Sequence, residues 1–212
     1  MHVSRIAALA VVSVLVGCSP YEEQAPAPKK NDKPSQVIKV KTPVPYGKKV
    51  ACADLLDTAK LGAALGSEVS LEDRSGSEAK ASSVCGVMLN GEAPGEAAQK
   101  RNFKDDMKLG VLPGDEICTI SAYCAFPTDT EDFKKRCQKA GDALNEALGQ
   151  WACVHQTQRA AEWAYTYKTI DPDTKCTLKV YGGPSVTDEK LVQTCTRAAL
   201  DTITPESITK YH

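Results

Sequence analysis

The distribution of the nine cysteines constrains this chain more than any other feature of its sequence. Cys18 lies alone near the amino terminus, and eight more follow residue 50: Cys52, Cys85, Cys118, Cys124, Cys137, Cys153, Cys176 and Cys195. An even number of cysteines in an exported chain indicates a disulfide framework. We therefore expect these eight to form structural disulfides that stabilise the fold.

Metal binding and redox catalysis explain the cysteines less well. The chain contains no Cys-x-x-Cys pair, and beyond residue 17 its only histidines are His155 and His212. Zinc-ribbon and haem-attachment spacings are therefore absent, and so is the motif of thioredoxin-like enzymes. We expect no metal and no cofactor.

An apolar run precedes Cys18 and ends at it. Residues 6–17 are too few to cross a hydrocarbon core of about 30 Å as a helix, but their length is typical of a secretory signal. The sequence Leu15-Val16-Gly17-Cys18 resembles a bacterial lipobox, at which lipoprotein signal peptides are cut. The resemblance implies that residues 1–17 are removed and that the Cys18 sulfur carries diacylglycerol. Two or three acyl chains would give a lasting membrane anchor.

The same resemblance bears on location and partners. Ser19 stands where an aspartate would favour inner-membrane retention in Gram-negative lipoproteins, so the outer membrane is expected if the organism has two membranes. Loss of Arg5 with the signal leaves 25 Lys and Arg against 27 Asp and Glu. This balance argues against nucleic-acid binding and against strong electrostatic attraction to lipid. A protein or small-ligand partner stays open.

Composition divides the remainder of the chain. Residues 18–49 hold six of the twelve prolines and little apolar sequence, which is typical of a disordered tether. Residues 50–212 are enough for a single domain.

Apolar periodicity predicts helices over residues 52–66, 93–110 and 127–149 and a last helix ending near Ile203. It predicts strands over residues 82–89, 116–126, 151–157, 162–170 and 175–182. The expected class is α+β with a mostly antiparallel sheet.

Two segments that begin at a cysteine and end in Ala-Leu-Gly, residues 52–66 and 137–149, suggest two related halves, 50–127 and 128–212. Residues 52–86 also resemble small secreted actinobacterial lipoproteins of unknown function, which implies no activity. Cys52 is expected to pair with Cys85 and, if the halves are related, Cys137 with Cys176. Cys118 and Cys124 would lie about 20 Å apart in one strand, so they need different partners.

Two groups of residues are candidates for function. Trp163, Tyr165 and Tyr167 alternate along one predicted strand and form either part of the core, which we favour, or a surface for a glycan or small ligand. His155 could serve an envelope hydrolase, but no Gly-x-Ser-x-Gly elbow accompanies it, and a structural role is favoured. The leading hypothesis is a lipid-anchored envelope protein with a binding or structural domain that is not an enzyme.

Overall fold

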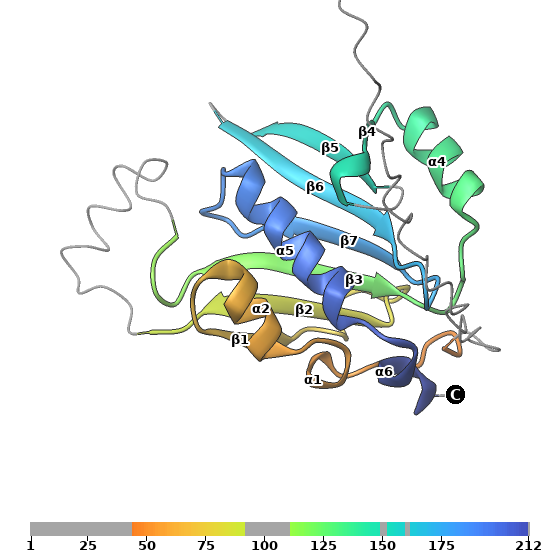
Figure 1. Cartoon of the computed structure of the whole chain (residues 1–212), viewed down its shortest axis with the longest axis horizontal. Helices are drawn as coiled ribbons and strands as arrows, with labels where there is room; N and C mark the ends of the chain where they lie inside the picture. The colour runs from red at the N-terminus through yellow and green to blue at the C-terminus, as the bar shows by residue number, and fades with distance from the viewer. Residues whose placement is uncertain (1–43, 92–110, 149–151, 160–161, 212) are drawn as a thin grey trace, which may run out of the picture. The chain divides into compact units, whose positions relative to one another are not determined.

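The computed structural model describes residues 44–91, 111–148, 152–159 and 162–211 (Figure 1). Within them the fold is α+β, with one seven-stranded sheet in the order β1-β2-β3-β7-β6-β5-β4. All neighbouring strands are antiparallel, which confirms the predicted class. The strands are β1 (Val69–Asp73), β2 (Ser83–Leu89), β3 (Glu116–Tyr123), β4 (Ala143–Asn145), β5 (Ala152–Arg159), β6 (Glu162–Ile170) and β7 (Thr177–Gly182).

The helices pack on both faces of this sheet. Their bounds are α1 (Cys52–Leu55), α2 (Thr58–Leu65), α4 (Thr130–Lys139), α5 (Glu189–Thr202) and α6 (Pro205–Thr209), with a 3₁₀ turn, η1, at Glu146–Leu148. Figure 1 shows α5 lying across the central strands beside α2. Ala152 and Val154 of β5 belong to this main core, whereas Cys153 between them packs with Phe133 and Cys137 of α4. Because alternate residues of a strand point to opposite faces, α4 covers the other face.

The helix predicted over residues 52–66 is two helices. Leu55 and Leu56 are both buried, and the backbone at Leu56 is extended, so the chain changes direction between them. Asp57 then starts α2 by accepting hydrogen bonds from the amides of Ala59 and Lys60. The helix ends as predicted at Gly66, whose φ of 68° is a left-handed conformation that glycine adopts without strain.

The helix predicted over residues 127–149 is wrong in its second half. It begins as expected, with Asp129 as the cap, but α4 ends at Lys139. Gly141 has a φ of 75°, and the amide of Asp142 donates to the carbonyl of Cys137, which closes the helix end. The chain then enters β4 and η1, so Leu144 and Leu148 do not continue the apolar stripe of α4.

The eight cysteines form four disulfides: Cys52–Cys85, Cys118–Cys195, Cys124–Cys176 and Cys137–Cys153. The predicted Cys52–Cys85 pair is confirmed, and Cys118 and Cys124 have different partners, as expected. The predicted Cys137–Cys176 pair is wrong. Cys176 immediately precedes β7 and lies beside Cys124 at the end of the adjacent strand β3, because β3 and β7 pair with each other.

The two predicted halves share one arrangement. In each, an opening helix is joined by a disulfide to the second strand that follows it: α1 to β2 through Cys52–Cys85, and α4 to β5 through Cys137–Cys153. Cys153, not Cys176, is therefore the counterpart of Cys85. A duplication itself stays a prediction.

The packed part of the chain begins before Val50. Val44 is fully buried, and Lys49 Nζ donates to the carbonyls of Glu78 (2.8 Å) and Ala81 (2.6 Å). Cys18, most of the predicted tether and the predicted helix 93–110 lie outside the described residues. None of the helices in the described ranges is long and apolar enough to span a membrane.

Candidate functional site

The sheet face that carries α4 is rich in polar side chains. The strand register places two rows on it: Thr119, Tyr181, Thr166 and His155, and beside them Ser121, Lys179, Lys168 and Cys153. The opposite face, under α2 and α5, carries the apolar residues Ile120, Leu178 and Val180. The polar face is therefore the face of the sheet on which a binding or catalytic site is expected.

Asp142 is the centre of this polar face near α4. Its side chain is only 1% exposed, and its carboxylate accepts hydrogen bonds from His155 Nδ1 (2.8 Å) and Lys168 Nζ (2.8 Å). Burial raises the pKa of this carboxyl, but the hydrogen bonds from Lys168 and His155 outweigh it and hold the pKa below its ordinary value. Asp142 is therefore an ionised, buried and fully bonded carboxylate at neutral pH.

A cavity of about 230 Å³ lies between α4 and the sheet beside this carboxylate. It is lined by Phe133, Arg136, Cys137, Asp142, Lys168 and Thr177. Phe133 and the Cys137–Cys153 disulfide give it an apolar wall, and the two cationic side chains give it a charged one. An apolar pocket with a few convergent polar groups is the usual form of a small-ligand site.

His155 is half exposed and does not line this cavity. Because the ionised carboxylate of Asp142 can only accept, His155 Nδ1 donates the hydrogen bond between them, which orients the ring. In many hydrolases an aspartate orients a histidine that acts as the general base. However, no hydroxyl of the described residues is hydrogen-bonded to His155, and Ser83 and Ser121, two serines that could have partnered a base, are fully buried.

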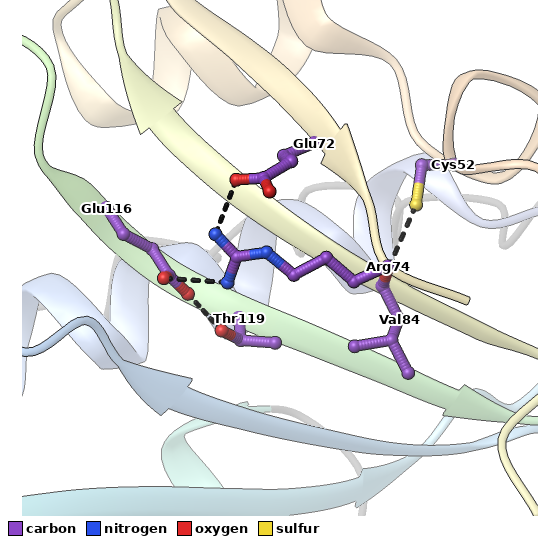
Figure 2. A network of polar contacts seen from close by, with 6 residues as sticks. All are labelled: Cys52, Glu72, Arg74, Val84, Glu116 and Thr119. Carbon is purple, nitrogen blue, oxygen red and sulfur yellow. Dashed lines mark hydrogen bonds and ion pairs between the residues drawn. The ribbon is translucent and has the colours of Figure 1, made fainter. Parts of the chain in front are cut away.

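A second polar network lies on the same face nearer β1. Arg74 donates to Glu72 (2.5 Å) and to Glu116 (2.9 Å), and Thr119 donates to the other oxygen of Glu116 (Figure 2). The hydrogen bonds that Arg74 donates to Glu72 and Glu116 raise the pKa of its guanidinium above its ordinary value. The charged groups of this network pair with one another, and the pairs link β1 to β3 across β2.

The aromatic row runs from the surface into the core. Trp163 is 49% exposed, Tyr165 packs at the margin of the core, and Tyr167 is fully buried and donates its hydroxyl to Glu189 of α5 (2.8 Å). The three rings therefore do not form one exposed platform, and only Trp163 is open to a ligand. Trp151, which precedes this hairpin, lies outside the described residues.

The sequence did not indicate Asp142, Lys168 or Arg136 as site residues. Asp142 falls within the helix predicted over residues 127–149, and no local pattern relates it to Lys168, which lies on β6. Within the described ranges, no cluster of three or more His, Cys, Asp or Glu residues has the geometry to hold a metal ion.

The fold and its cysteines define a disulfide-stabilised α+β domain. Four disulfides in one domain are typical of proteins that fold outside the cytoplasm, where thiols are not kept reduced. Comparison of the chain with protein-family models, with curated proteins and with solved structures finds no match. Any function must therefore be argued from the residues themselves.

Proposed function

We propose that this protein is a lipoprotein of the cell envelope that displays a disulfide-stabilised ligand-binding domain. The observation that carries the proposal is the pairing of the cysteines. All eight cysteines after residue 50 pair with one another, so Cys18 is left without a cysteine partner in the chain. That is the pattern expected if the Cys18 sulfur carries lipid and the others staple an exported domain.

The residues around Cys18 support the same proposal. Leu15-Val16-Gly17-Cys18 has the form of a lipobox, and the proline-rich residues that follow suit a spacer between a bilayer and a folded domain. If the cell has two membranes, Ser19 after the cysteine favours the outer membrane. The domain acts by binding, because its polar face carries a cavity but no assembled set of nucleophile, base and acid among the described residues.

Intact-mass analysis tests the anchor directly. The full chain, produced in a bacterium with a lipoprotein pathway and taken from the membrane fraction, should begin at Cys18, carry acyl chains there and contain no free thiol. The Cys18→Ser variant should lose the acyl mass while its eight other cysteines stay paired. A wild-type chain that begins at Met1, or eight free thiols, would overturn the proposal.

The hydrogen bond between His155 and Asp142 favours a second candidate, an envelope hydrolase with His155 as its base. Esterase or amidase activity of the full chain should then vanish in His155→Ala. The matched control is His212→Ala, since His212 is the other histidine after the predicted cleavage point. Activity that survives His155→Ala excludes this candidate.

A further inference from the structure

The cavity under α4 has an excess of positive charge. Arg136 and Lys168 each contribute one positive charge to its lining, and Asp142 contributes one negative charge. Both oxygens of Asp142 already accept hydrogen bonds, Oδ1 from His155 and Oδ2 from Lys168. The buried carboxylate therefore balances Lys168, and among the residues that line the cavity the charge of Arg136 is not balanced.

Lys168 and Arg136 each have N–H groups that can donate further hydrogen bonds. An ammonium has three N–H donors, and Lys168 gives one of them to Asp142. A guanidinium has five, and within the described residues Arg136 uses its Nε, which donates to the carbonyl of Asp132 (3.3 Å). The fork of terminal amino groups on Arg136 matches the two oxygens of a carboxylate.

Phe133 and Cys137, on the same helix as Arg136, give the cavity an apolar part. Phe133, Cys137, Cys153 and Ile170 form a small cluster separate from the main core, and the disulfide fixes two of its members. At about 30 Å³ per water molecule, the cavity of about 230 Å³ holds roughly eight waters, or an organic molecule with about that number of heavy atoms.

We propose that this cavity binds a small organic carboxylate. Its carboxyl group pairs with Arg136 and Lys168, and its apolar body lies against Phe133 and the Cys137–Cys153 disulfide. A monoanion matches the single excess positive charge, which a phosphate dianion would exceed. The inference rests on the proposed binding role of the domain and names its ligand class, but it does not depend on the lipid at Cys18.

Titration with probes of one shape and different charge tests the proposal. The full chain, purified in detergent, is titrated with benzoate, benzamide and benzylamine, and binding is followed by calorimetry and by amide NMR shifts. Acetate, butyrate and inorganic phosphate complete the set. We expect benzoate or butyrate to bind at least ten-fold more tightly than benzamide and than phosphate, with shifts centred on α4 and β6.

One substitution and its matched control locate the site. Arg136→Gln, at an exposed position of α4, should weaken carboxylate binding at least ten-fold and leave the thermal midpoint nearly unchanged. Lys139→Gln removes the same charge three residues further along α4, outside the cavity lining, and should change binding by less than two-fold. Equal binding of benzoate and benzamide, equal effects of the two variants, or no saturable carboxylate binding would each overturn the inference. A missing lipid at Cys18 would leave these results unchanged, so the two proposals fail separately.

Discussion

Gly86 lies directly beneath the guanidinium of Arg74, and a Cβ atom placed on Gly86 would be 3.1 Å from Arg74 Cζ. The missing side chain lets Arg74 lie against β2 and reach Glu72 on β1 and Glu116 on β3 (Figure 2). Gly86 thus permits an ion-pair network that links β1 to β3 across β2 at the edge of the sheet.

This contact predicts opposite effects of one substitution in two backgrounds. Gly86→Ala should lower the free energy of unfolding of the wild type by up to about 1 kcal/mol, because the new methyl group forces the guanidinium to shift by a few tenths of an ångström and weakens its hydrogen bonds to the two carboxylates. In an Arg74→Ala background it should raise that free energy by about 0.5 kcal/mol, because alanine restricts the unfolded chain more than glycine does. Urea unfolding of the four proteins in a double-mutant cycle measures both values. The same change in both backgrounds would contradict the contact.

Asp73 predicts a pH dependence of stability. Burial raises its carboxyl pKa, but hydrogen bonds from Ser75 and from the backbone amide of Cys52 outweigh it and lower the pKa below the ordinary value. A lowered folded-state pKa gives stability that is present above the unfolded-state pKa of about 4 and lost as the pH falls through the folded-state value.

Asp73→Asn should therefore cost about 1 kcal/mol at pH 7, a modest value because the carboxylate is partly in water. The difference from wild type should shrink as the pH is lowered below about 4. Denaturant unfolding at a series of pH values measures it. The control Glu68→Gln alters a carboxylate that makes no hydrogen bond within the described residues, and it should have little effect at any pH. A cost for Asp73→Asn that is constant with pH would contradict the assignment.

Sequence patterns predicted the elements with strong local signals and missed those fixed by distant contacts. The apolar stripe of α5 and the pairing of Cys52 with Cys85 followed from periodicity and proximity. Strand β1 was not predicted, since it is a short edge strand with three polar residues. The polar cluster at Asp142 was missed because it requires both the end of α4 at Gly141 and the register of β6 against β5. No local sequence pattern predicts the end of this helix or the register of these strands.

The disulfides predict an order of stability losses. In the chain-entropy model, replacing both cysteines of the Cys137–Cys153 pair, 16 residues apart, by alanine costs about 3 kcal/mol. The same change at Cys118–Cys195, 77 residues apart, costs about 4.5 kcal/mol. Thermal unfolding under non-reducing conditions should rank the variants in this order. Peptide mapping of the wild type should find the four observed pairs, and a Cys137–Cys176 bond would contradict the structure.

Tyr167 and Tyr165 predict different responses to the loss of a hydroxyl group. Tyr167 is fully buried, and its hydroxyl joins β6 to Glu189 in the first turn of α5. Tyr167→Phe should therefore lower the free energy of unfolding by about 1.5 kcal/mol, the usual value of a hydrogen bond to a charged group. The hydroxyl of Tyr165 has no hydrogen-bond partner in the described part of the chain, so Tyr165→Phe should change stability by less than about 0.5 kcal/mol. Urea unfolding compares the two variants, and equal losses would show that α5 is not tied to the sheet through Tyr167.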